Sequence, residues 1–272
     1  MRRDPALCRD HGFEPIARGP DRMSDASTPA PTGLPLFYSR PEALRAELHG
    51  ETRVTLAPDY RFAGTTHAAP LNAVEFASAS RHYPIVFAAN TEKPAAIAVL
   101  GLRRDMNVFV DAAGKWVEDT YIPSYIRRYP FILARNDEGS EFTLCLDMDS
   151  DKVGTDKETA LFDGLEPSDI TKKALEFCAA YQREARESEA VLAKLAEHDL
   201  LVPNEGRFTL PSGEVLTVND FRVVDETRFN ALDDAAFLDL RHSGALSAIY
   251  CHLLSMRNWP TLLRLLEAGK AA

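Results

Sequence analysis

The sequence lacks an apolar stretch long enough to cross a membrane. Its longest apolar run, residues 95–102, contains a glycine and falls far short of the ~20 residues that a membrane helix needs. The first 22 residues include Arg2 and Arg3 but no apolar segment of the kind that a secretion signal requires. These absences argue against a membrane transporter. They predict a soluble, cytoplasmic protein, with surface association through signal-independent export as the alternative.

Basic charge is also scarce. The 31 Lys and Arg residues are outnumbered by 41 Asp and Glu residues, so the formal net charge is −10 at pH 7. No basic stripe offsets this excess, and the sequence therefore disfavours nucleic acid and anionic membrane surfaces as partners. Apolar residues make up 45% of the chain, which is enough for a well-buried core.

Motifs that carry reactive groups are missing. His67 and His82 have no HxH, HxD or HExxH spacing, so both are predicted to be hydrogen-bonded structural histidines. No serine lies in a GxSxG context. The cysteines form no CxxC pair, which favours reduced thiols; they are Cys8, Cys145, Cys178 and Cys251. We therefore expect no catalytic residue and no cofactor, and a protein that binds rather than catalyses.

The first part of the chain carries the signals of short β-strands. Its apolar runs are rich in Val, Ile and Phe and are separated by turn formers, which predicts an antiparallel meander. A tight turn is expected where Gly114 can adopt a positive φ. Ser39 and Glu42 form a capping box and predict a helix that ends at Gly50. The predicted strands are residues 52–56, 71–76, 83–87, 95–100, 107–110 and 142–146.

Helices dominate the second part. Ser168 is a suitable N-cap for a helix of about thirty residues, which would span roughly 45 Å. A hairpin turn is expected at residues 211–213, and short amphipathic helices follow Asp225. The long helix offers a surface for a homodimer, although packing in the core is the simpler interpretation. Its apolar face includes Ile170, Ala174, Phe177, Cys178 and Tyr181.

These patterns together predict an α+β fold. It would contain a mostly antiparallel sheet within residues 52–146, one long helix, then a hairpin and a C-terminal helical cluster within residues 168–272. Residues 35–272 are expected to form a single domain. Residues 1–34 include a stretch rich in Ser, Thr and Pro and are expected to be a disordered arm, with translation starting at Met1 or Met23.

Aromatic and arginine side chains gather around a short helix that is predicted after Pro123. A guanidinium offers a planar fork to a carboxylate or phosphate, and aromatic rings offer flat walls. The group predicts a site for an anionic or amino-acid-like small molecule, either binding or catalytic. The alternative is that the rings pack in the core and the arginines are solvated or stack on them. The residues are Trp116, Tyr121, Tyr125, Arg127 and Arg128.

Residues 147–158 follow part of the pattern of a calcium-binding loop. Asp147, Asp149, Asp151 and Glu158 occupy its first, third, fifth and twelfth positions. Lys152 stands where such a loop needs glycine, and a predicted strand precedes the segment in place of a helix. The pattern leaves two interpretations open: a calcium site that stabilises assembly, and a solvated acidic loop.

Several segments resemble the SapC-like family of bacterial proteins, and the phrases NVFVD and RRYPF are the most distinctive. The segments are residues 71–87, 98–133, 144–150, 161–168, 221–246 and 252–258. The family is named for a protein associated with a surface layer. The resemblance therefore implies a soluble, non-enzymatic binding or assembly protein associated with a bacterial surface layer, acting through protein partners or self-assembly. It transfers no catalytic residue.

Overall fold

The computed structural model describes residues 34–89, 91, 93–135 and 142–271, so residues 1–33 of the expected arm, with Met1 and Met23, lie outside the described residues. Residues Pro35–Ala272 form one unit, which holds all the elements named below. Its sheets are built largely from the N-terminal half and helices dominate the C-terminal part, so the predicted α+β class is confirmed.

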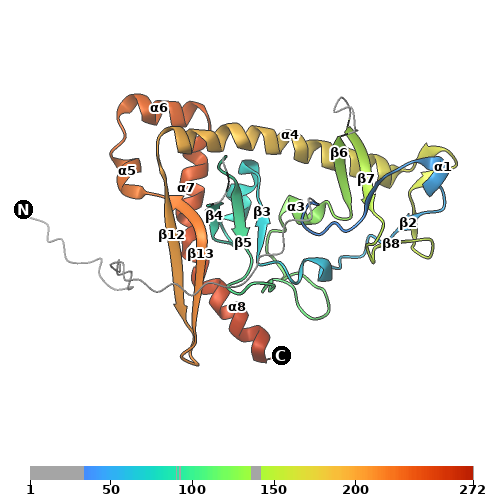
Figure 1. Ribbon diagram of the computed structural model, residues 1–272, viewed down its shortest axis with the longest axis horizontal. Helices are drawn as coiled ribbons and strands as arrows, with labels where there is room; N and C mark the ends of the chain where they lie inside the picture. The colour runs from blue at the N-terminus through green and yellow to red at the C-terminus, as the bar shows by residue number, and fades with distance from the viewer. Residues whose placement is uncertain (1–33, 90, 92, 136–141, 272) are drawn as a thin grey trace, which may run out of the picture. The chain divides into compact units, whose positions relative to one another are not determined.

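The largest sheet is antiparallel and five-stranded (Figure 1). In spatial order its strands are β12 (Leu201–Thr209), β13 (Val215–Val224), β4 (Ile85–Ala88), β5 (Ala96–Val99) and β3 (Ala68–Pro70). Ile85, Val86 and Phe87 are fully buried, as an apolar strand in the middle of a sheet should be. The strands predicted at residues 83–87 and 95–100 and the hairpin are therefore confirmed.

A second set of strands surrounds a separate apolar cluster. One sheet has the order β1 (Pro41–Ala43), β7 (Phe142–Asp147), β6 (Phe131–Arg135), and another has the order β8 (Val153–Gly154), β2 (Arg53–Val54), β9 (Thr159–Ala160). Strands β10 (Phe162–Asp163) and β11 (Glu166–Pro167) form a small hairpin. The cluster contains Val54, Phe131, Leu144, Leu146 and Leu161.

Helix α4 (Asp169–Glu197) runs past strands β4 and β5 of the largest sheet and past strands β6 and β7 (Figure 1). Leu192 and Leu195 pack in the larger cluster with the five-stranded sheet, whereas Cys178 packs in the second cluster. Ser168 takes the N-cap position as predicted, but its hydroxyl donates to the Ala160 carbonyl (2.8 Å) and does not cap the helix. The apolar face of α4 thus packs into both apolar clusters.

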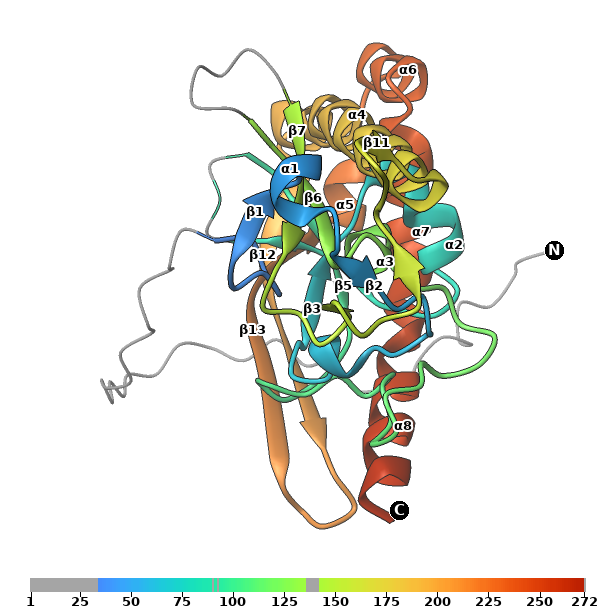
Figure 2. The same cartoon turned by 90° about the vertical axis from the view of Figure 1, so that its right-hand side faces the viewer.

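Four further helices complete the chain: α5 (Glu226–Asn230), α6 (Asp234–His242), α7 (Ala245–Ser255) and α8 (Trp259–Ala271). Asp225 and Asp233 cap α5 and α6 by accepting from backbone N–H groups. Trp259 packs on Phe208 and Phe221, which holds α8 against the β12–β13 hairpin (Figure 2). No helix in the described ranges is long and apolar enough to span a membrane.

The helix predicted from Ser39 to Gly50 is wrong over its first half. Residues 41–43 form strand β1, and only Ala46–His49 is helical, as α1. The backbone N–H groups of Ser39 and Arg40 donate to Oδ1 of Asp147 (3.2 and 2.7 Å), which holds this segment extended against β7. A partner more than 100 residues away therefore overrides the local capping signal.

Two predicted strands are also wrong, because side chains take up the backbone groups that a ladder would need. Residues 73–75 form the 3₁₀ turn η2 (Ala73–Glu75), followed by α2 (Phe76–Ala79), and the N–H of Asn72 donates to Oε2 of Glu75 (3.0 Å). In residues 107–110, the Asn107 side chain accepts from the N–H of Phe109 (2.9 Å). Val108 and Phe109 each make a backbone hydrogen bond to another segment, but the one β-bridge that this described segment forms is the isolated one between Val110 and Trp116.

His252 is a core histidine, as its surroundings in the sequence suggested. It is fully buried, its Nδ1–H donates to the carbonyl of Ile85 (2.6 Å), and its Nε2 accepts from the N–H of Val224 (3.1 Å). Burial lowers the pKa of His252 to about 4, because the imidazolium would lose its hydration. The imidazole thus joins α7 to strands β4 and β13 in its neutral form.

We expect the fold to lose stability in mild acid through His252. Its pKa is lower in the folded than in the unfolded protein, so its contribution is complete above about pH 6.5 and is lost as the pH falls toward about 4. Between about pH 7 and pH 5 the free energy of unfolding should fall by roughly 2 kcal/mol from this group. Urea titrations of wild type and His252→Gln measure it: the amide keeps both hydrogen bonds but does not titrate. Equal pH slopes in the two proteins would contradict the expectation.

Candidate functional site

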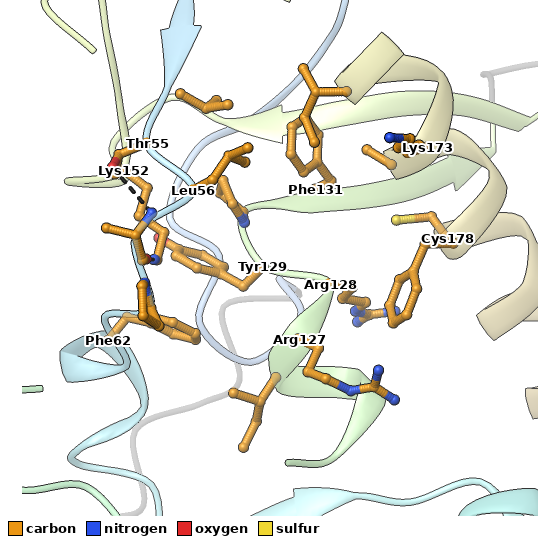
Figure 3. Close-up of a pocket in the computed structure, with 18 of the residues that line it drawn as sticks. Thr55, Leu56, Phe62, Arg127, Arg128, Tyr129, Phe131, Lys152, Lys173 and Cys178 are labelled. Carbon is orange, nitrogen blue, oxygen red and sulfur yellow. Dashed lines mark hydrogen bonds between the residues drawn. The ribbon is translucent and has the colours of Figure 1, made fainter. Parts of the chain in front are cut away.

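A cavity of about 390 Å³ lies where the two apolar clusters meet (Figure 3). Its walls come from the segment after β2, from the turn between α3 (Ser124–Arg127) and β6, and from the first half of α4. Ile126 and Phe62 belong to the larger cluster or pack against it, whereas Phe131 and Ile170 belong to the second cluster or pack against that. Binding pockets commonly form at such junctions.

Helix α3 gives the two neighbouring arginines different surroundings. It starts after Pro123, as predicted, and Pro130 prevents it from continuing. Successive residues on a helix point about 100° apart. Arg127 is therefore exposed, while Arg128 turns into the protein and is only 6% exposed.

Arg128 is surrounded by aromatic rings and has no anionic partner among the residues that the structure describes. Its guanidinium carbon lies 4.1 Å from the ring centre of Tyr125, 4.5 Å from that of Tyr181 and 5.7 Å from that of Tyr38. Its Nε is buried without a hydrogen-bond partner, and Arg128 forms no ion pair with any described carboxylate. Ring faces offset part of the cost of burying a cation, but a buried charge is normally paired with an anion.

The three tyrosines do not supply that anion. Burial raises the pKa of Tyr38, Tyr125 and Tyr181 above the usual range, and the nearby charge of Arg128 opposes this only in part. Their hydroxyls are therefore neutral at physiological pH. The positive charge of Arg128 remains without a counterion in the described part of the protein.

The charged residues that line the cavity are all cationic: Arg127, Arg128, Lys152 and Lys173 (Figure 3). No aspartate, glutamate or histidine is among the described lining residues. Lys152 donates from Nζ to the carbonyl of Ala57 (2.9 Å), and burial lowers the pKa of this lysine. Lys173 is exposed on α4. The lining thus combines apolar walls with positive charge.

Arg127 is held at the edge of this cavity by three hydrogen bonds. Its Nε donates to the carbonyl of Ile122 (3.0 Å), and its Nη2 donates to Oγ of Ser124 (2.8 Å) and to the hydroxyl of Tyr121 (3.3 Å). The guanidinium also lies over the ring of Phe177, 5.3 Å from its centre. Its position is therefore set by the protein before any ligand arrives.

The structure brings only part of the predicted ligand group together. Arg127 and Arg128 line the cavity, and Tyr125, which does not line it, packs its ring on the guanidinium of Arg128. Tyr121 contacts Arg127 but does not line the cavity. Trp116 is buried elsewhere, stacked on Phe109 with ring centres 6.0 Å apart. Trp116 packs in the core, and both arginines stack on tyrosine rings, which the alternative interpretation expected. Both arginines also line the cavity, so the structure leaves the ligand-site interpretation open for them.

The four carboxylates of the predicted calcium loop do not converge, since the described residues contain no group of three or more side chains that could hold a metal ion. Asp147 is buried, and its oxygens already accept from the N–H groups of Ser39 and Arg40 and from the hydroxyl of Tyr129. Asp147 therefore anchors residues 39 and 40 to strand β7, and this geometry does not support the calcium interpretation.

The other three carboxylates of that loop line a neighbouring cavity of about 380 Å³. Asp149 pairs with Arg40, and Asp151 and Glu158 line this cavity together with Lys152. Lys152 lines both cavities. The described charged residues of the first cavity are all cationic, whereas those of the second carry both signs of charge.

Sequence reasoning missed several residues of the site. Tyr181, Phe177 and Cys178 had been placed on the apolar face of the long helix by their spacing, but spacing alone does not tell a core wall from a cavity wall. Tyr38 and Lys173 gave no signal, because neither belongs to a motif. Burial raises the pKa of Cys178 to about 11, so its thiol is protonated and unreactive at neutral pH.

A protein-family model described as SapC matches residues 44–262, a range that contains all the lining residues of the cavity. Tyr38 lies outside the matched range. No curated protein and no solved structure matches the chain.

Proposed function

We propose that this protein, which belongs to the SapC family, binds a small organic anion with an apolar body in the cavity beside Arg128. The observation that carries the proposal is the buried guanidinium of Arg128, which has no carboxylate partner among the described residues and lines a cavity whose described charged residues are all cations. An anionic group near Arg127 and Arg128 would supply the missing countercharge, and the apolar walls would cover the rest of the ligand.

The charge of the lining narrows the class of ligand. An amino acid carries an ammonium group as well as a carboxylate, and an ammonium group needs an acceptor with negative charge. The described lining contains no such side chain and places Lys152 and Lys173 near the ligand instead. We therefore favour an anion without an ammonium group, such as an aryl or acyl carboxylate, over an amino-acid-like ligand.

Binding fits this lining better than catalysis. General acid–base chemistry needs a group that exchanges protons near neutral pH, most often a histidine or carboxylate. The described lining has neither, and the thiol of Cys178 is held protonated by burial. Lys152, whose pKa burial lowers, already donates its Nζ to the carbonyl of Ala57. Association with a bacterial surface layer, self-assembly and a homodimer stay predictions of the family resemblance and of the long helix.

Two dyes with nearly the same aromatic body test the proposal. Anilinonaphthalene sulfonate is anionic, whereas N-phenylnaphthylamine is neutral, and both fluoresce more strongly in apolar sites. Reversing the charge in Lys173→Glu should weaken binding of the anionic dye about tenfold, because the mutation replaces attraction by repulsion at the cavity wall. Fluorescence titration measures the affinity, and binding of the neutral dye should change little.

Lys172→Glu is the matched control. Lys172 neighbours Lys173 on α4 and is also exposed, but it does not line the cavity. The two variants have the same net charge, so a difference between them reports the local field in the cavity. If both variants bind the anionic dye as well as wild type does, this cavity is not an anion site.

A further inference from the structure

A buried carboxylate lies behind the arginine at the cavity edge. Glu75 is only 4% exposed. Its Oε1 accepts from the hydroxyl of Tyr121 (2.8 Å) and from the N–H of Ser124 (2.7 Å), and its Oε2 accepts from the N–H of Asn72 (3.0 Å). Glu75 forms no ion pair with a described cation. Three hydrogen bonds therefore satisfy a buried negative charge that has no direct cationic partner in the described part of the chain.

Tyr121 connects this carboxylate to Arg127. The hydroxyl proton of Tyr121 is directed at Glu75, so its oxygen is free to accept from Nη2 of Arg127 (3.3 Å). A hydroxyl that donates to a carboxylate is a stronger acceptor, because hydrogen bonds in a chain polarise one another. The ring of Tyr121 also lies under the guanidinium, with 5.6 Å between its centre and the guanidinium carbon. The Tyr121 side chain thus links the Glu75 carboxylate to the Arg127 guanidinium through two hydrogen bonds.

Ser124 provides a second connection. Its hydroxyl accepts from the same Nη2 of Arg127 (2.8 Å), while its backbone N–H is bound to Glu75. Both side chains that accept from Nη2 are therefore held in place by one carboxylate. A neutral side chain at position 75 would be enough to connect η2 to α3 by hydrogen bonds. Burying a charged one instead costs free energy. The buried charge of Glu75 is explained if its function is to orient Tyr121 and Ser124, and through them the guanidinium of Arg127.

We propose that Glu75 and Tyr121 are positioning residues of the anion site, which hold the Arg127 guanidinium at the cavity edge. This inference rests on the proposed function. The ligand would meet an arginine that is already oriented, so less side-chain freedom is lost on binding. Glu75 and Tyr121 do not line the cavity, so they would act on the ligand only through Arg127.

Tyr121→Phe tests the inference, because it keeps the ring beneath Arg127 and removes only the connecting hydroxyl. We expect binding of anilinonaphthalene sulfonate to weaken about fivefold, the factor that one net hydrogen bond contributes. Binding of N-phenylnaphthylamine should not change, since a neutral dye does not depend on Arg127. Modification of Arg127 by phenylglyoxal, read by mass spectrometry without any ligand, should become faster. Glu75→Gln should likewise weaken binding of the anionic dye and speed the modification of Arg127, and it should leave binding of the neutral dye unchanged.

Tyr250→Phe serves as the control: Tyr250 is exposed and belongs neither to the described cavity lining nor to the hydrogen bonds of Glu75, so both dye affinities and the modification rate should stay at the wild-type values. Equal dye affinities and equal modification rates in wild type and Tyr121→Phe would overturn the inference and leave the proposed function intact. If wild type binds neither dye while Tyr121→Phe still speeds modification of Arg127, the positioning contact stands and the proposed function falls. Equal weakening of both dyes would mean a structural role and would also overturn the inference.

Discussion

Arg128→Met is expected to weaken binding of anilinonaphthalene sulfonate by at least about thirtyfold, because it removes the buried charge that would pair with the anion. Methionine has a similar length, and its thioether packs well against aromatic rings such as those of Tyr38, Tyr125 and Tyr181. The neutral dye should bind as before or more tightly. Fluorescence titration with both dyes gives the two affinities.

The same variant should remain stable, and this separates a ligand site from a structural arginine. Replacing Arg128 loses ring contacts but also removes a buried charge that has no counterion among the described residues, and such replacements are often neutral. We expect the free energy of unfolding to change by less than about 1 kcal/mol. A fall of roughly 3 kcal/mol or more in a urea titration would show that the arginine stabilises the fold. The proposed site would then lose its main support.

Asp147→Ala should have the largest effect on stability. The carboxylate of Asp147 accepts from the N–H groups of Ser39 and Arg40 and from the hydroxyl of Tyr129, and it is 1% exposed. Removing it leaves three donors without their acceptor and releases the segment that carries Tyr38. We expect the free energy of unfolding to fall by about 3–5 kcal/mol. Urea or thermal unfolding measures the change.

Asp149→Ala is the control for that prediction. Asp149 is exposed and pairs with Arg40 across the surface, so its loss should cost less than about 1 kcal/mol. Asp147→Asn should fall between the two, because an amide oxygen can still accept from the backbone. If Asp147→Ala were as stable as Asp149→Ala, the anchoring role assigned to Asp147 would be wrong.

The elements that sequence reasoning found are those whose signal is local. Strands β4 and β5, the hairpin and the long helix α4 each carry their own periodicity and turn residues, and all lie where they were predicted. The prediction failed where a distant group takes the backbone hydrogen bonds. The Asp147 carboxylate does this for residues 39 and 40, and no pattern near Ser39 could show it.

Part of the candidate site could likewise be predicted from local sequence, and part of it depends on distant segments. Adjacent arginines on a short helix between Pro123 and Pro130 predicted a place where guanidinium groups and aromatic rings meet. Which arginine is buried, and what surrounds it, could not be predicted. Tyr38 and Tyr181 come from segments far apart in the chain and meet at Arg128 only in the folded protein. The buried Glu75 was assigned to a strand that does not exist.

The sequence by itself determined the α+β class, the long helix, the family and the pair of arginines, because periodicity, turn chemistry and composition are properties of neighbouring residues. Tertiary structure decided the rest. Packing into two apolar clusters leaves a cavity at their junction, gathers Lys152 and Lys173 around it and encloses Arg128 among three neutral rings. Burial and charge balance depend on which distant segments meet, and only the folded chain brings those segments together.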